Sequence, residues 1–250
     1  MKSRPERPSR RLLHTSDVHV GCDSNGLRGG TDRGYESLAG VVDLGRDLQV
    51  DLLIIAGDLF DNLRVRPDMV GQVGELLAAG GLRTIILPGN HDPHMNGSIY
   101  DRHGALFPDH VHILRDSDGE VLVFPDIDLQ IWGKAHASFD DHAPLHPPPR
   151  WHDHDHPERR LWRVAVGHGL YYEGVGDDHR SYLIHDDHLA AIDADYVALG
   201  HIEVHRAVGP NEVVAFYPGA PDRTGGATLI ELSDAAVNVE HVKFRIPVRA

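Results

Sequence analysis

The feature that most constrains the fold of this chain is a set of short apolar runs, each followed at once by polar residues that can bind a metal. Residues 51–56 precede Gly57-Asp58, and residues 84–87 precede Pro88-Gly89-Asn90-His91-Asp92. Continuous apolar strands are typical of a parallel sheet buried on both faces. Because ligands bind beyond the carboxyl ends of such strands, the pattern predicts a functional site at one edge of a sheet.

Two segments with helical spacing of apolar residues separate the first three strands. They cover residues 32–48 and 67–79, and Gly80-Gly81 ends the second. The alternation predicts right-handed crossovers and a largely parallel sheet. From residue 111 onward short strands predominate, with 111–114 and 120–124 flanking a turn. We expect further antiparallel strands over 213–217, 227–232 and 237–244, so the second half would complete a second sheet.

Length and composition fit one α/β domain. The 250 residues are 41% hydrophobic, and no apolar run approaches the roughly 20 residues that span a bilayer. The N-terminus lacks a secretory signal, so we expect a cytoplasmic protein without membrane association. We predict a disordered basic tail over 1–10 and a single domain over 11–250. Within it, 135–160 would form a solvated loop rich in histidine, aspartate and proline.

Five predicted strands end in side chains able to bind a metal. These are Asp17 and His19, Asp58, Asn90 and His91, His168, and His201 and Glu203. Each strand end alone fits an ordinary turn as well as a ligand. Together they are too many for one ion and about right for two. The mix of carboxylate, imidazole and amide oxygen suits Mn²⁺, Fe²⁺ or Zn²⁺.

In chain order, Asp17-Val18-His19, Gly57-Asp58, Gly89-Asn90-His91-Asp92, Gly167-His168 and Gly200-His201 resemble the motifs of the calcineurin-like metallophosphoesterase superfamily. Softer cues, such as Tyr217-Pro218-Gly219-Ala220-Pro221, are most similar to the SbcD-type DNA repair exonuclease branch. The resemblance covers about residues 11–245. It implies a four-layered α/β/β/α sandwich, with two mixed β-sheets flanked by helices and no separate DNA-capping domain.

The resemblance also implies a dinuclear site. Asp17 and His19 would hold the first cation, and Asp58 would bridge both. The second cation would be held by Asn90, His168 and His201. Hydroxide between the cations would attack phosphorus, His91 would protonate the leaving group as general acid, and the Asp61 carboxylate would orient His91. We expect Mn²⁺ first, with Fe²⁺ or Zn²⁺ as alternatives.

The last motif departs from the family pattern Gly-His-x-His, because Glu203 stands where the second histidine would complete the first site. Strand alternation would place Glu203 and His205 on the face of His201. We take Glu203 as the ligand and His205 as its rival. Three arginines in or near predicted loops are candidate phosphate-binding residues: Arg28, Arg64 and Arg66.

Three function classes remain open. The first is a phosphodiesterase of the SbcD exonuclease type, which would act on single-stranded nucleic acid or with a partner subunit, because the net charge of −14 disfavours autonomous binding of duplex DNA. The second is a small-molecule phosphodiesterase or phosphomonoesterase acting on a cyclic nucleotide or another organophosphate. The third is a non-catalytic metal-bound scaffold, which the altered last motif favours. The oligomeric state stays open.

Overall fold

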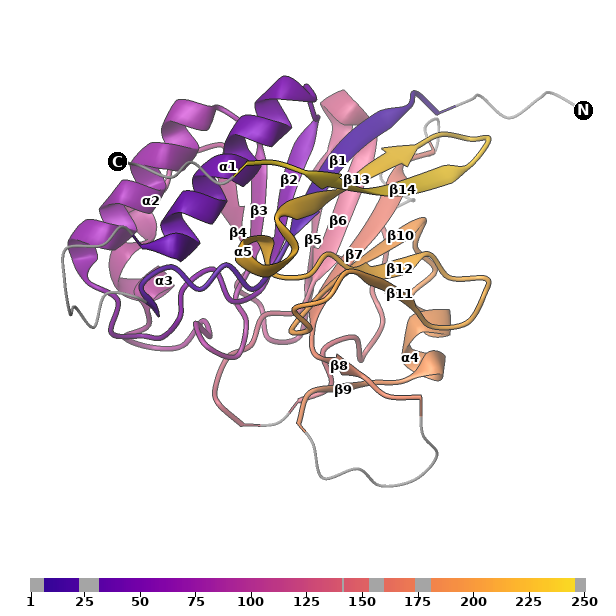
Figure 1. The fold of residues 1–250 in the computed structure, drawn as a ribbon. Helices are drawn as coiled ribbons and strands as arrows, with labels where there is room; N and C mark the ends of the chain where they lie inside the picture. The colour runs from indigo at the N-terminus through magenta and orange to yellow at the C-terminus, as the bar shows by residue number, and fades with distance from the viewer. Residues whose placement is uncertain (1–6, 23–31, 141, 153–159, 174–180, 246–250) are drawn as a thin grey trace, which may run out of the picture.

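The first of two stacked sheets contains the strand–helix alternation that the sequence predicts. A computed structural model of the chain describes residues 7–22, 32–140, 142–152, 160–173 and 181–245. The parallel strands are β1 (Arg10–Thr15), β2 (Leu52–Ala56), β3 (Thr84–Leu87) and β4 (Val111–Ile113). The antiparallel strands β13 (Gly226–Leu232) and β14 (Val237–Lys243) extend the sheet beyond β1. Both predicted helices, α1 (Arg33–Asp47) and α2 (Pro67–Gly80), cover its outer face (Figure 1).

The second sheet has the order β11-β12-β10-β7-β6-β5. Its strands are β5 (Glu120–Phe124), β6 (Leu129–Gly133), β7 (Trp162–His168), β10 (Tyr196–Gly200), β11 (Arg206–Val208) and β12 (Ala215–Tyr217). The shorter elements are α3 (Ile99–His103), α4 (Asp186–Ala191), α5 (Pro221–Thr224), the 3₁₀ turns η2 (Gly104–Leu106) and η3 (Pro125–Ile127), and the two-stranded sheet of β8 (Leu170–Tyr171) and β9 (Leu183–Ile184).

Three separate apolar clusters hold four layers together. Alternate residues of β2 face opposite ways, as expected of a strand: Leu53 and Ile55 pack against α1 and α2, whereas Leu52 and Ile54 pack against the second sheet. A third cluster lies on the outer face of the second sheet and includes Leu189 of α4. These layers confirm the predicted α/β/β/α sandwich.

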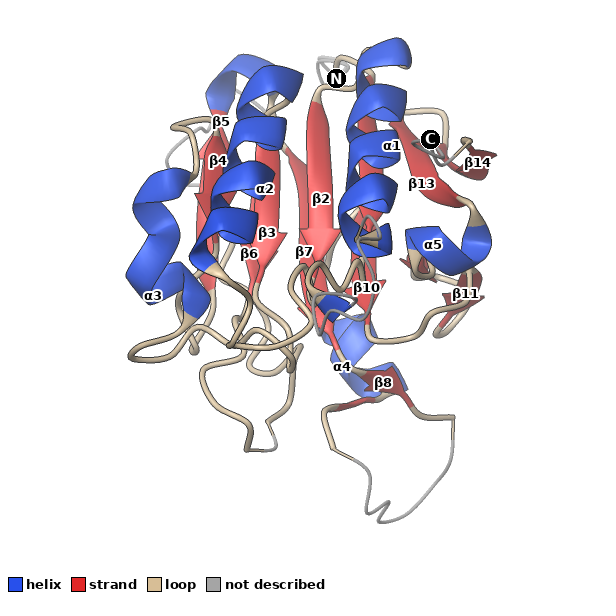
Figure 2. Cartoon of the chain, turned by 60° about the vertical axis from the view of Figure 1, so that its left-hand side comes forward, coloured by secondary structure: helices blue, strands red, loops and turns tan. Residues whose placement is uncertain are grey.

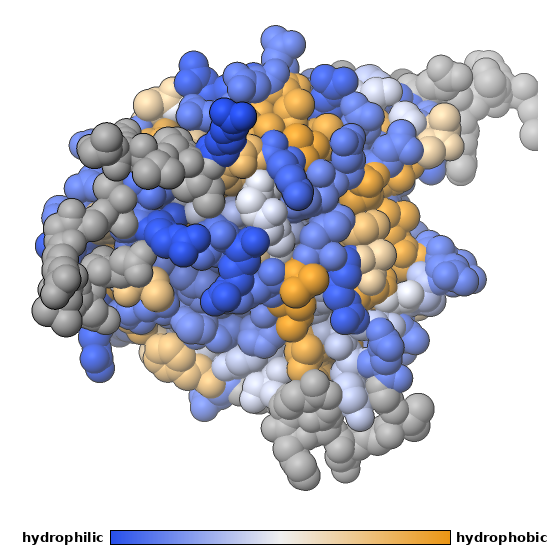
Figure 3. Space-filling view, viewed as in Figure 1, coloured by the Kyte–Doolittle hydropathy of each residue, from blue (hydrophilic) through white to orange (hydrophobic). Residues whose placement is uncertain are grey.

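The inter-sheet layer reaches the surface at one side. Four of its partly buried members lie on or next to β12 and β14: Val214, Phe216, Val237 and Val239. On the face shown in Figure 3, hydrophilic residues predominate, and exposed apolar residues gather beside these strands.

Two strand pairings differ from the predicted ones. β4 and β5 were expected to flank one turn, but β4 pairs with β3 in the first sheet and β5 pairs with β6 in the second. The strand predicted over 213–217 was expected to be antiparallel, but β12 runs parallel to β10. Local sequence shows where strands begin and end, whereas pairing depends on contacts between distant segments.

The predicted disordered tail is wrong for residues 7–10. The guanidinium of Arg7 lies 3.3 Å from the ring centre of Trp162, with ion pairs of 2.9 Å to Asp195 and 2.8 Å to Asp234. Arg10 already belongs to β1. These partners lie more than 150 residues away in sequence, so composition gave no sign of them. Residues 1–6 lie outside the described chain.

The histidine-rich segment is not simply a solvated loop. Its described residues, 135–140, 142–152 and 160, contain no helix or strand, in line with the loop prediction. Leu145, however, is fully buried and packs with α4 in the outer cluster, and Trp151 packs against the same cluster. Part of the fourth layer is therefore loop. No helix in the described ranges combines the length and apolarity needed to cross a membrane.

Candidate metal centre

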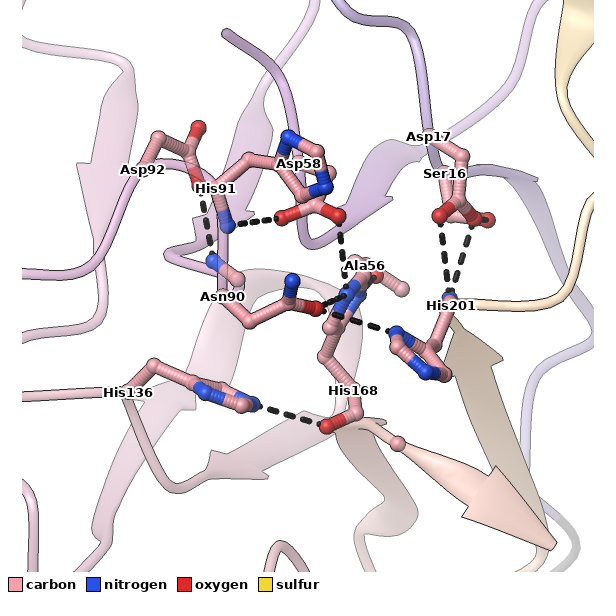
Figure 4. A network of polar contacts seen from close by, with 12 residues as sticks. Ser16, Asp17, Ala56, Asp58, Asn90, His91, Asp92, His136, His168 and His201 are labelled. Carbon is pink, nitrogen blue, oxygen red and sulfur yellow. Dashed lines mark hydrogen bonds and ion pairs between the residues drawn. The ribbon is translucent and has the colours of Figure 1, made fainter. Parts of the chain in front are cut away.

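Four donor side chains converge where β2, β3, β7 and β10 end (Figures 2 and 4). Asn90 Oδ1 lies 3.0 Å from His168 Nε2 and 3.0 Å from His201 Nδ1. His168 Nε2 lies 3.1 Å from Asp58 Oδ2. One carboxylate, one amide oxygen and two imidazole nitrogens thus surround one point. This donor set fits a borderline divalent cation such as Mn²⁺, Fe²⁺ or Zn²⁺.

The tautomer of His168 suits a ligand. Its Nδ1 donates to the backbone carbonyl of Ala56, 2.8 Å away at the end of β2, which leaves Nε2 facing the other donors. The glycine before Asp58 makes this approach possible. A Cβ on Gly57 would lie 1.9 Å from His168 Nδ1, and its φ of +92° also favours glycine.

A buried ion pair links two of these donors. Burial disfavours charge on both partners, but the negative charge of Asp58, at hydrogen-bond distance, raises the pKa of His168 to about 9. Burial likewise opposes ionisation of Asp58, yet the charge of His168 lowers its pKa below the usual range. A cation bound to His168 Nε2 would replace the proton there.

A second donor group shares Asp58. His19, Asp58 and His91 offer ligand atoms within 4.8 Å of one another. The buried Nδ1 of His19 has no hydrogen-bond partner and lies 3.7 Å from Asp61 Oδ1, which fits the role of a metal ligand. Asp17 stands beside both groups and belongs to neither. Its carboxylate accepts from Ser16 Oγ at 2.5 Å and from the backbone N–H of His201 at 3.0 Å.

The backbone is strained at these positions. Of the eight non-glycine residues with positive φ in the described chain, four are Asp17, His19, Asp58 and His201. A left-handed conformation at such residues persists only when the surrounding structure enforces it, and it is concentrated at functional sites.

His91 is exposed and held through its main chain and one ring nitrogen. Its backbone N–H donates to Asp58 Oδ1 at 2.9 Å. Its Nδ1 donates to the backbone carbonyl of Asp61 at 2.8 Å. The prediction that the Asp61 carboxylate orients His91 therefore differs from the structure, in which that carboxylate accepts from Asn62 Nδ2. The carbonyl fixes the tautomer of His91 equally well, because it can only accept.

Glu203 and His205 point elsewhere. β10 ends at Gly200 and His201 has a φ of +100°, so the strand alternation assumed for residues 201–205 does not apply. Glu203 Oε2 lies 2.5 Å from Arg223 Nε, and His205 Nδ1 lies 3.1 Å from Thr228 Oγ1. Neither side chain belongs to the two donor groups found among the described residues.

Two of the three candidate arginines lie near His91. Arg64, Arg66 and His91 line one cavity of about 570 Å³. Arg66 is already bound by Asp68, at 3.0 Å through Nε and 2.5 Å through Nη2. Arg28 lies outside the described residues.

Two residues behind the donors were not assigned to the site from sequence. Buried Asp92 accepts hydrogen bonds from the backbone of Phe60 and Gly89 and from the hydroxyl of Tyr100, so it ties the loops after β2 and β3 together. Buried His136 donates through Nε2 to the carbonyl of His168 at 2.8 Å (Figure 4). His136 lies in a segment whose composition indicated only a loop, so its sequence carried no specific signal.

Residues 10–204 match the family model of the calcineurin-like phosphoesterases. The chain belongs to this family. It is therefore a metal-dependent phosphoester hydrolase, as its motifs predict, and family membership supports catalysis over the scaffold alternative. The family also implies divalent cations, in agreement with the two donor groups.

Similar calcineurin-like phosphoesterases include the SbcD component of the SbcCD nuclease of Rhodobacter capsulatus, 32% identical over 44% of this chain and 33% of that protein. The DNA double-strand break repair protein Mre11 of Methanopyrus kandleri is 31% identical over 39% of this chain and 21% of its own length. Both agree with the predicted SbcD-type branch. This chain spans a third or less of these relatives.

A longer match and a solved structure extend the likeness to nearly the whole chain. The uncharacterized metallophosphoesterase YhaO of Bacillus subtilis is 26% identical over 92% of this chain and 57% of its own length. The crystal structure of TT1561 of Thermus thermophilus superposes with a TM-score of 0.59 at 13% identity, covering 94% of this chain and all of that one. At that identity the superposition supports the fold alone.

Proposed function

We propose that this calcineurin-like phosphoesterase is a phosphodiesterase with two divalent cations. The observation that carries the proposal is the convergence of Asp58, Asn90, His168 and His201 within 3.0–3.1 Å contacts at four strand ends. These four would hold the second cation. His19 and Asp17 would hold the first, with Asp58 between the two.

When bound, the cations would neutralise the phosphoryl oxygens and lower the pKa of the attacking water. The remaining chemistry belongs to the chain. His91, held by the carbonyl of Asp61, would give its proton to the leaving alkoxide. Its exposure and its place on the wall of a 570 Å³ cavity support this role, because a leaving group must reach it. Arg64 would bind the substrate phosphate from the same cavity.

Mn²⁺ is the cation we propose, because oxygen donors outnumber nitrogens once Asp17 is included and oxygen-rich sites favour harder ions. Fe²⁺ and Zn²⁺ remain the alternatives. The second site has its donors already assembled, whereas Asp17 is engaged by the backbone of His201. The second site should therefore fill first in a titration.

The substrate we propose is single-stranded nucleic acid, and the site of action the cytoplasm. The names of the SbcCD and Mre11 relatives support a nuclease, whereas the net charge of −14 disfavours unaided binding of duplex DNA. A partner subunit could supply duplex binding. A small-molecule phosphodiesterase or phosphomonoesterase is the alternative, since the site itself recognises only the phosphoryl group.

A substrate comparison tests the proposal. The full chain, loaded with Mn²⁺, Fe²⁺ or Zn²⁺, would be assayed on bis-p-nitrophenyl phosphate, p-nitrophenyl phosphate, and single- and double-stranded DNA. We expect Mn²⁺-dependent hydrolysis of diesters and single strands, with kcat/KM at least about tenfold above that for the monoester. Preference for the monoester would overturn the phosphodiesterase assignment.

Metal content of two variants tests how the first site is completed. Glu203 is 2.5 Å from Arg223, so it must leave that ion pair to bind a cation, whereas His205 must leave Thr228. We retain Glu203 as the ligand and predict that Glu203→Ala loses about one cation per chain while His205→Ala keeps both. Arg223→Gln is the matched control and should keep both cations, since it only frees Glu203. Two cations in Glu203→Ala would refute the assignment.

A further inference from the structure

The cavity beside His91 is large enough for more than a phosphate. Its volume of about 570 Å³ lies within the range of pockets that hold small organic ligands. One wall is the loop 62–66 after β2, and Gly21, His91 and Phe139 line the rest. Phe139 comes from the histidine-rich segment, far from the other lining residues in sequence. The cavity thus lies between two loops that reach it from different sheets.

Phe139 is an aromatic ring presented to this cavity. Its exposed fraction is 59%, and among the large apolar side chains exposed in the described chain it is the aromatic one. The backbone beneath it is fixed, because its carbonyl accepts from the hydroxyl of Tyr182 at 3.0 Å and the next N–H donates to Ser138 Oγ at 3.0 Å. The ring therefore stands on an anchored loop instead of packing into the core.

Arg64 supplies the second half of the recognition chemistry. Its loop is held by two hydrogen bonds, from the Arg64 N–H to Asn62 Oδ1 at 2.8 Å and from Arg102 Nη2 to the Leu63 carbonyl at 2.9 Å. The guanidinium itself has no partner within the described part of the chain, unlike that of Arg66, which Asp68 binds. The cavity therefore combines an aromatic face, an available guanidinium and His91. Aromatic stacking together with a guanidinium is how proteins hold single-stranded nucleotides.

We propose that this cavity binds the nucleoside on the leaving-group side of the scissile phosphate, with its base stacked on Phe139 and the next phosphate held by Arg64. The inference rests on the proposed function, because the leaving group is the one to which His91 would give a proton. It makes Phe139 a residue that determines specificity. Bases stacked within a duplex cannot lie on the ring, so the site selects single strands.

A pair of oligonucleotides tests the stacking. Both are short single strands cleaved by the Mn²⁺-loaded full chain, and one carries an abasic residue at the leaving-group position. The wild type should show a KM for the intact strand roughly 5- to 150-fold below that for the abasic strand, the range expected for one base on an aromatic ring. Phe139→Ala should remove this difference, and Phe139→Trp should keep it. Leu106→Ala, which removes another exposed apolar side chain, should change nothing.

Binding provides a readout that does not need turnover. A strand with 2-aminopurine at the leaving-group position should lose fluorescence on the wild type and on Phe139→Trp, and remain bright on Phe139→Ala. If Phe139→Ala distinguishes the two strands as the wild type does, or quenches 2-aminopurine equally, the stacking proposal is wrong although the phosphodiesterase stands. If no phosphoester is turned over while quenching depends on Phe139, the proposed function fails and the binding site stands.

Discussion

Replacing His91 with glutamine should lower kcat for diesters with an alkoxide leaving group by about 10²- to 10⁴-fold, the usual contribution of a general acid. Glutamine keeps much of the side-chain volume but has no proton to transfer. Substrate binding should change little, so KM should stay near its wild-type value. The defect should be much smaller for bis-p-nitrophenyl phosphate, because its leaving group departs without protonation. The measurement is kcat on both substrates under identical metal loading.

Metal content decides between two roles for the same ring. His91 shares a donor group with His19 and Asp58, so its position also suits a ligand. A general acid can be removed without loss of a cation, whereas a ligand cannot. His91→Gln with two cations and a defect that depends on the leaving group supports the acid. Loss of one cation, with equal defects on both substrates, would make His91 a ligand and leave the proton donor to be found elsewhere.

Replacing Asp58 with asparagine should have the largest effect on the metal centre. Asp58 belongs to both donor groups and is almost fully buried, with Oδ2 3.1 Å from His168 and Oδ1 accepting from the His91 backbone. Asparagine preserves its shape but removes the charge that would hold two cations together. We expect kcat/KM to fall by at least about a thousandfold, since the cations are worth several kcal/mol of transition-state stabilisation.

The control for Asp58 lies at the other end of the same strand. Asp51 precedes β2 and accepts from the backbone N–H of Arg11, so Asp51→Asn removes a carboxylate far from the centre. Metal analysis after dialysis should find less than one cation per chain in Asp58→Asn and two in Asp51→Asn. An Asp58→Asn protein that retains both cations and appreciable activity would exclude Asp58 as the bridging ligand.

The convergence of donors could be predicted because it depends on local patterns. Each of the segments 51–56 and 84–87 is apolar and continuous, which identifies a buried strand, and the residues that follow lie at its carboxyl end. Parallel strands bring such ends to one edge. Asp58 and Asn90 therefore meet without any information about the second sheet. His168 and His201 follow by the same reasoning from β7 and β10.

Other features depend on contacts that no local pattern contains. The partners of Arg7 lie on distant parts of the chain, so a residue with the composition of a tail is fixed by an aromatic ring and two carboxylates. The position of Glu203 depends on β10 ending at Gly200, one residue before alternation would have aligned it. Asp61 contacts His91 through its main chain, which residue type alone does not predict.

The hydrogen bond from His168 to the Ala56 carbonyl joins β7 of one sheet to β2 of the other. Asp58 and Asn90 follow strands of the first sheet, whereas His168 and His201 come from the second. The distance between ligands is therefore set by the thickness of the apolar layer in which Ile54 packs. A displacement of about 1 Å can cost on the order of a hundredfold in rate. Selection for turnover would then act on the volumes of core side chains that never meet a substrate, and repacking that layer would change the enzyme before it unfolded the protein.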